Sequence, residues 1–156
     1  MKKLKIYLDT SVISHLDADD APKEMADTLK LWEDIKAGIY EICISDLTIA
    51  ELGGCYEPKR SEMLSQLAGI EYIKIAQDER AEQLSQLYLD VGGLPPKSKN
   101  DAMHIAIASV NDCDIILSWN FKHIVNLRAM TAVEEVNFKK RYKNIRILSP
   151  AMLLDS

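Results

Sequence analysis

Short β-rich runs alternate with helical stretches along this chain, and the alternation limits its fold more than any other feature. The β-rich runs cover residues 4–8, 40–44, 71–75, 114–118 and 145–148. Helical spacing is seen over residues 10–16, 22–37, 47–52, from 58 onward, and over 77–91, 98–110 and 124–142. Strands that alternate with helices predict an α/β fold with a mostly parallel sheet and helices on both faces. The order of the strands does not follow from this pattern.

Length and composition limit the class of protein. With 156 residues, of which 47% are hydrophobic and 28% charged, the chain fits a single domain spanning residues 1–156. No apolar run reaches membrane length, and Asp9 interrupts the apolar stretch after the amino-terminal lysines, so we expect no membrane span, no signal peptide and a cytoplasmic location. The scattered cysteines Cys43, Cys55 and Cys113 argue against a disulfide framework or a zinc site.

Charge is distributed unevenly along the chain, whose net charge is −5. The first 96 residues hold 18 acidic and 10 basic residues, whereas the last 60 hold 6 acidic and 9 basic residues. Such asymmetry permits phosphate binding without establishing it. The basic cluster at residues 139–146 is expected to be a solvated helix end, with phosphate binding as the alternative.

Three acids stand where predicted strands give way to helices. Asp9 follows the first strand, Glu51 lies on the helix after the second strand, and Asp101 lies at the start of the helix after a Pro-Pro break. In a parallel sheet these connections share one edge, where ligands and catalytic groups collect. Each acid alone is also explained as a helix cap or a favourable charge at a helix start. If the three carboxylates meet in partly apolar surroundings, they repel one another and need a cation.

The donor type indicates which cation that would be. Hard oxygen ligands without a histidine or cysteine cluster favour Mg²⁺ or Mn²⁺ over zinc. Such ions typically serve phosphoryl chemistry, because they lower the pKa of a bound water, orient it and stabilise charge on the leaving oxygen.

Motifs around these acids follow one another in a recognisable order. They are Leu8-Asp9-Thr10-Ser11-Val12, Ile49-Ala50-Glu51-Leu52, Asn100-Asp101-Ala102-Met103-His104-Ile105-Ala106 and Leu117-Ser118-Trp119-Asn120-Phe121-Lys122-His123. The ordered set resembles that of PIN-domain nucleases, whose small bacterial members include the VapC-type toxins. The resemblance runs through nearly the whole chain. It implies a Rossmann-like α/β/α PIN domain and Mg²⁺- or Mn²⁺-dependent cleavage of RNA phosphodiester bonds.

The resemblance also implies which residues carry the chemistry. Asp9, Glu51 and Asp101 match the acidic metal ligands of the family. Many members have a further Asp where this chain has Asn120, a neutral ligand at best. The substitution lowers the charge available for a second cation and leaves binding of one or two metals open.

Further polar residues lie beside these positions. Thr10 and Ser118 resemble site hydroxyls, with a helix-cap or strand-end hydrogen bond as the alternative. His104 lies one helical turn from the third acid, and we expect a hydrogen-bonded core histidine, with support of the metal site as the alternative.

Basic residues near the third and fourth motifs are candidate substrate contacts. Lys99, Lys122 and His123 could reach a phosphate of the RNA. The alternative is an exposed loop with no ligand.

These observations lead to the hypothesis of a metal-dependent endoribonuclease that is the toxin component of a type II toxin–antitoxin pair. The resemblance adds an antitoxin partner, expected near residues 22–37 and 47–67, and a homodimer. The alternative is a catalytically weakened PIN-like module that binds RNA or protein. A phosphatase of the haloacid-dehalogenase type also begins with a strand and an Asp, but it needs a second Asp where this chain has Ser11.

Overall fold

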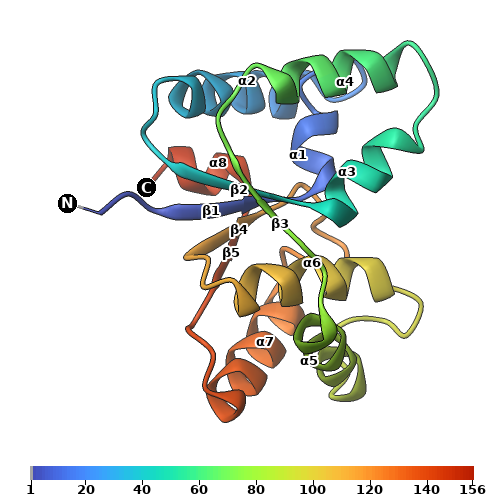
Figure 1. Cartoon of the computed structure of the whole chain (residues 1–156), viewed down its shortest axis with the longest axis vertical. Coiled ribbons are helices and arrows are strands. Elements are labelled where there is room, and N and C mark those ends of the chain that lie inside the picture. The colour runs from blue at the N-terminus through green and yellow to red at the C-terminus, as the bar shows by residue number, and fades with distance from the viewer. Residues whose placement is uncertain (1) are drawn as a thin grey trace.

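The computed structural model describes residues 2–156, which form a parallel sheet between two layers of helices (Figure 1). The strands are β1 (Lys5–Leu8), β2 (Glu41–Ser45), β3 (Ile73–Ile75), β4 (Ile115–Leu117) and β5 (Arg146–Leu148). Their order across the sheet is β3-β2-β1-β4-β5, and every neighbouring pair is parallel. The predicted α/β class is confirmed, and the strand order is now defined.

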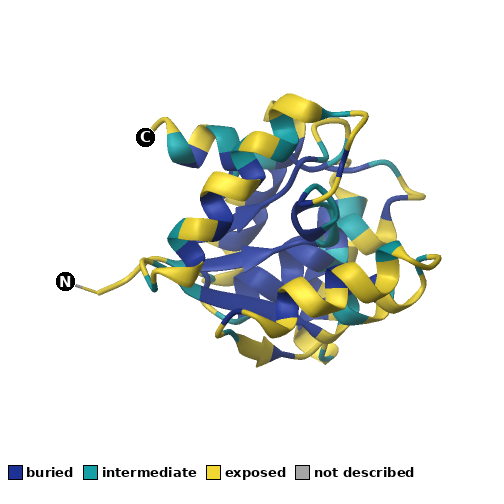
Figure 2. Cartoon of the chain, turned by 90° about the horizontal axis from the view of Figure 1, so that it is seen from above, coloured by how far each residue is buried: buried dark blue, intermediate teal, exposed yellow. Residues whose placement is uncertain are grey.

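Helices cover both faces of this sheet. They are α1 (Thr10–Ser14), α2 (Pro22–Lys36), α3 (Asp46–Gly53), α4 (Lys59–Ala68), α5 (Glu79–Asp90), α6 (Lys99–Val110), α7 (Leu127–Lys140) and α8 (Pro150–Leu154). One hydrophobic cluster packs α5, α6 and α7 against one face of the sheet. A second cluster packs five helices against the opposite face, namely α1, α2, α3, α4 and α8. Figure 2 shows buried central strands between helices whose outer sides are exposed, whereas the edge strand β3 is mostly exposed. In residues 2–156 no helix is long and apolar enough to cross a membrane.

Strand β1 lies at the centre of the sheet, between β2 and β4. Ile6, Tyr7 and Leu8 are fully buried, because helices cover both faces of the strand. Ile6 and Leu8 belong to one hydrophobic cluster and Tyr7 to the other, since successive strand residues point to opposite faces. Asp9 follows directly after Leu8, so its carboxylate lies at the carboxyl end of the central strand.

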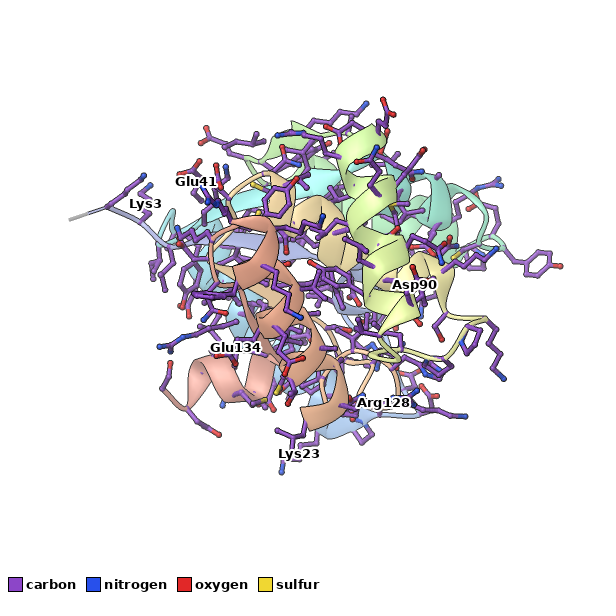
Figure 3. The ribbon with its side chains drawn as sticks, turned by 90° about the horizontal axis from the view of Figure 1, so that it is seen from below. Lys3, Lys23, Glu41, Asp90, Arg128 and Glu134 are labelled. Atoms are coloured by element: carbon purple, nitrogen blue, oxygen red, sulfur yellow. The ribbon has the colours of Figure 1, made fainter. Side chains whose placement is uncertain are left out.

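The outer surface of α5 and α7 is charged. Figure 3 views this side of the molecule, where Asp90 on α5 and Arg128 and Glu134 on α7 are exposed. The loop after α5 packs closely on α7, since a Cβ added at Gly93 would lie 2.5 Å from that of Ala132. Glycine at this position therefore permits the close approach.

Two helices differ from the sequence-based expectation. The helix predicted over residues 124–142 begins later, at Leu127, because the Asn126 side chain caps it by accepting the Ala129 N–H at 2.8 Å. The structure also adds α8, which was not predicted. Ser149 caps this helix, and Pro150 is compatible with its first position, which needs no N–H donor.

Candidate active site

Asp9 both caps α1 and lies at the carboxyl end of the sheet. Its Oδ1 accepts hydrogen bonds from the Ser11 hydroxyl at 2.6 Å and from the Val12 N–H at 3.3 Å. The residue is only 4% exposed. Burial raises the pKa of the Asp9 carboxyl above its ordinary value, although His104 and these hydrogen bonds lower it. A buried carboxylate of this kind is stabilised by a nearby cation.

Hydroxyl groups join the end of β1 to the end of β4. Ser11 Oγ, which donates to Asp9, accepts the backbone N–H of Trp119 at 2.9 Å and lies 3.4 Å from Ser118 Oγ. Ser118 Oγ accepts the backbone N–H of Asn120 at 2.9 Å. These bonds fix the position of Asp9 relative to the segment that follows β4.

Asn120, the candidate fourth ligand, holds the turn after β4. Its Oδ1 accepts the backbone N–H of His123 at 3.0 Å, and its carbonyl oxygen accepts those of Ile124 and Val125. The amide oxygen has a second lone pair, so this bond does not prevent a further contact. The side chain supplies no negative charge to the three acids.

Glu51 on α3 is tied to α1 and α6. Thr10 Oγ1 donates to Glu51 Oε1 at 2.6 Å, and His104 Nε2 lies 2.6 Å from the same oxygen. Burial acts to raise the pKa of Glu51, but the hydrogen bonds from His104 and Thr10 outweigh it and hold the pKa below its ordinary value. Glu51 is therefore an anion at neutral pH.

A buried chain of polar groups runs from His104 into the sheet. His104 Nδ1 lies 2.6 Å from the Tyr7 hydroxyl, which lies 2.7 Å from Ser45 Oγ. Ser45 also caps α3 by accepting the Thr48 N–H at 3.1 Å. Burial raises the pKa of Tyr7 far above its ordinary value, so Tyr7 keeps its proton and can donate it in a hydrogen bond.

Asp101 is half-buried in the first turn of α6. Burial raises the pKa of Asp101, and the negative charges of Asp9 and Glu51 raise it further. His104 and His123 act in the opposite direction. Asp9 and Glu51 therefore both lie within electrostatic reach of Asp101, at the carboxyl end of the sheet.

A hollow of about 410 Å³ lies beside Asp101. Its lining residues are Lys97, Ser98, Lys99, Asn100, Asp101 and His123. Two of the three predicted phosphate contacts, Lys99 and His123, thus gather next to the third acid. Lys122 is exposed and does not line this hollow.

Two residues of the site were not predicted from the sequence. The Tyr7 hydroxyl lies within hydrogen-bond distance of His104 Nδ1, and Ser11 donates a hydrogen bond to Asp9. For Tyr7 a signal was present, because a tyrosine in a strand buried on both faces needs a partner for its hydroxyl. Ser11 belongs to the first motif, but its bond depends on how the chain turns after Asp9.

The oxygen donors fit a hard divalent cation, although the acids do not form a closed cage. Across residues 2–156, no three His, Cys, Asp or Glu side chains are grouped closely enough to hold a metal ion. Mg²⁺ is commonly held by one or two carboxylates and completes its octahedral shell with water. Asp9 and Asp101 supply such carboxylates, and their raised pKa values are those of groups that a positive charge would stabilise.

Comparisons with known proteins place this arrangement in context. The sequence model of the family described as PIN domain matches residues 6–123. A comparison with curated proteins gave no match.

Two solved structures share the fold. VapC20 of Mycobacterium tuberculosis, described as a sarcin-ricin loop cleaving toxin, aligns with a TM-score of 0.58 at 15% identity, over 75% of this chain and 91% of that one. VapBC2 from Rickettsia felis, described as bound to a DNA fragment from its promoter, aligns with a TM-score of 0.54 at 20% identity, over 94% and 98% of the two chains. At these identities the likeness concerns the fold.

Proposed function

Because the chain belongs to the PIN domain family, we propose that it is a metal-dependent endoribonuclease acting at the carboxyl end of its sheet. The placement of Asp9, Glu51 and Asp101 at the carboxyl end of the sheet carries the proposal, since the burial of Asp9 and Asp101 and the repulsion of Asp101 by the other two acids call for a cation. The fold neighbour described as a sarcin-ricin loop cleaving toxin supports RNA as the substrate class.

The acids and the basic residues of the site have different proposed roles. Asp9 and Asp101 would hold Mg²⁺ or Mn²⁺, with Glu51 as a third ligand or the acceptor of a metal-bound water. Such a cation supplies an activated water and stabilises negative charge on a phosphate. Lys99 and His123 beside Asp101 attract the RNA backbone and place it against the acids.

Cleavage of RNA by the full-length protein tests this function. We expect cleavage with Mg²⁺ or Mn²⁺ and none with excess chelator. Asp9→Asn and Asp101→Asn should each slow cleavage on the order of 10²-fold or more, because each removes a charge from the cation site. Cleavage that persists in both variants, or in chelator, would contradict the proposal.

A second candidate is a binding module with a weakened site. The neutral Asn120 favours it, as does the lack of a closed ligand cage within the described residues. Isothermal titration with Mn²⁺ separates the two candidates. Measurable binding supports the nuclease, whereas no binding together with intact RNA association supports the module.

We also propose an antitoxin partner, because a fold neighbour is the VapBC2 assembly. Apolar side chains are exposed on and beside the helices where that partner was expected, namely Leu29 on α2, Leu64 on α4 and Tyr56 before α4. Co-purification of a small protein that suppresses RNA cleavage would support this role. Harmless expression of the active protein alone would contradict it.

A further inference from the structure

We infer that His104 and Tyr7 are positioning residues that hold Glu51 by one carboxylate oxygen, so that only the other oxygen is presented to a cation or its water. The inference rests on the proposed function and deepens the role of the same site. It depends on three observations: the bonds to Glu51 Oε1, the fixation of His104 at both ring nitrogens, and the burial of His104, Tyr7 and Ser45.

The first observation concerns the two oxygens of Glu51. Oε1 accepts from Thr10 Oγ1 at 2.6 Å and lies 2.6 Å from His104 Nε2. A carboxylate oxygen offers two lone-pair positions, and these two partners occupy both. Oε2 takes part in neither of these two bonds, and the Asn100 side chain is a further polar group near Glu51. Since each carboxylate oxygen has two lone pairs, Oε2 is the oxygen that keeps an open position for a ligand.

The second observation is that His104 cannot turn without losing a partner. Its Nδ1 lies 2.6 Å from the Tyr7 hydroxyl, and the two rings meet edge to face with centroids 5.7 Å apart. Tyr7 is a neutral phenol, so it can donate to Nδ1, and this leaves the ring proton on Nε2 to be donated to Glu51. Ser45 Oγ, 2.7 Å from the Tyr7 oxygen, completes the chain.

The third observation is that water does not compete for these bonds. Tyr7 and Ser45 are fully buried, and His104 is 3% exposed. A cation that took Glu51 Oε1 would leave the His104 N–H buried without an acceptor, which is unfavourable. In histidine–carboxylate arrangements of this kind, the outer partner sets the orientation of the inner group.

The chain offers a matched control in Tyr88. This tyrosine is also fully buried, but its hydroxyl donates to Asn137 Oδ1 at 2.5 Å and lies 3.2 Å from Ser109 Oγ. Tyr7→Phe and Tyr88→Phe therefore remove the same atom from similar surroundings. Only Tyr7→Phe alters a series of hydrogen-bonded groups that ends on an acid, Glu51.

Mn²⁺ affinity of the full-length variants tests the inference by isothermal titration, with the melting temperature of the metal-free protein as the measure of folding. We expect Tyr7→Phe and His104→Leu to weaken Mn²⁺ binding about 10-fold. His104→Gln, whose amide N–H can take the place of Nε2–H, should recover most of the affinity. Tyr88→Phe should lower the melting temperature as Tyr7→Phe does, with unchanged Mn²⁺ affinity.

Two results would overturn the inference: unchanged Mn²⁺ affinity in Tyr7→Phe, or an equal loss in Tyr88→Phe. Nitrogen NMR of the His104 ring in the metal-free wild-type protein provides a second measurement, independent of any metal and of the folding of variants. We expect a proton on Nε2, and a ring protonated on Nδ1 alone would contradict the arrangement. If the wild type neither bound Mn²⁺ nor cleaved RNA, the proposed function would fail, whereas the NMR result would still decide the orientation of His104.

Discussion

Two buried tyrosines in this protein have similar surroundings and different connections. Tyr7 belongs to an open network, which we define as Ser45, Tyr7, His104 and Glu51. Tyr88 belongs to a closed network, defined as Tyr88, Ser109 and Asn137. Both tyrosines are fully buried, and burial raises the pKa of both hydroxyls. The difference lies in where each network ends.

In the closed network, each of the three side chains is hydrogen-bonded to the other two. The Tyr88 hydroxyl bonds to Asn137, and the Asn137 amide donates to Ser109 Oγ at 3.0 Å, so α5, α6 and α7 are joined at one buried point. The open network ends on Glu51, whose side chain is 31% exposed beside two acids with raised pKa values. Burial of polar groups therefore does not by itself indicate a function. The two networks differ in that only the open network ends on a partly exposed carboxylate.

The largest effect on stability is expected in the closed network. Asn137→Ala removes the amide that bonds to both the Tyr88 hydroxyl and Ser109 Oγ, and it leaves a small cavity, so we expect a loss of about 2–4 kcal/mol in the free energy of unfolding. Urea denaturation measures it. Mn²⁺ affinity of the folded variant should equal that of the wild type, and a clear loss of affinity would show that the closed network also serves the site.

A gain in stability is expected at Asp9, one of the two acids with raised pKa values near the Glu51 end of the open network. Asp9→Asn keeps an amide oxygen for Ser11 and Val12 but removes a buried charge, so the metal-free variant should gain about 1 kcal/mol at neutral pH. Thermal melting in chelator measures it. Asp78→Asn is the control, because Asp78 is a partly exposed helix cap whose pKa is lowered by the Ala81 N–H, and that change should bring no gain. An Asp9→Asn protein that is less stable than the wild type would contradict the view that burial of the Asp9 charge destabilises the metal-free protein.

A smaller effect is the opposite pH dependence of stability that we expect for substitutions at Asp9 and at Glu51. The folded pKa of Asp9 is raised, so its contribution to stability is present at low pH and is lost as pH rises through that pKa. The gain from Asp9→Asn should therefore shrink as pH falls toward about 4. The folded pKa of Glu51 is lowered, so Glu51→Gln should cost stability at neutral pH and less as pH falls through the folded pKa. Melting temperatures across this range test both signs, and parallel curves for the two variants would contradict them.

The smallest effect is expected at Asn120. An Asp there can still accept the His123 N–H and adds a negative charge near the acids, so Asn120→Asp should tighten Mn²⁺ binding severalfold. Isothermal titration measures it. Asn111→Asp, at the opposite end of α6 from Asp101, adds the same charge away from Asp101 and is the control for net charge. It loses the bond from Asn111 Nδ2 to the Ile107 carbonyl but should leave the affinity unchanged. Equal effects of the two changes would mean that only net charge matters.

The fold was predictable where local pattern decides it. Strand and helix positions follow from apolar periodicity, which is carried by neighbouring residues. The order of the strands in the sheet was not predictable, because it depends on packing between distant segments. The helix α8 was missed although Ser149 and Pro150 form a recognised helix start, because the segment is only 5 residues long.

In the candidate site, the placement of the acids was predictable where chain position decides it. Asp9, Glu51 and Asp101 follow from their places at strand ends and helix starts, which share one edge of a parallel sheet. The contact between Tyr7 and His104 joins residues 97 positions apart, so it depends on which face of β1 packs on α6. Sequence spacing alone contains no such information.

Anomalous diffraction from a crystal soaked in Mn²⁺ examines the acid site most directly. We expect a manganese peak held by Asp9 and Asp101, on the side of Glu51 that presents Oε2, with the His104 bond to Oε1 intact. A manganese ion bound elsewhere, or no peak at these acids in a crystal that binds Mn²⁺ at other positions, would contradict the proposal that they form the metal site.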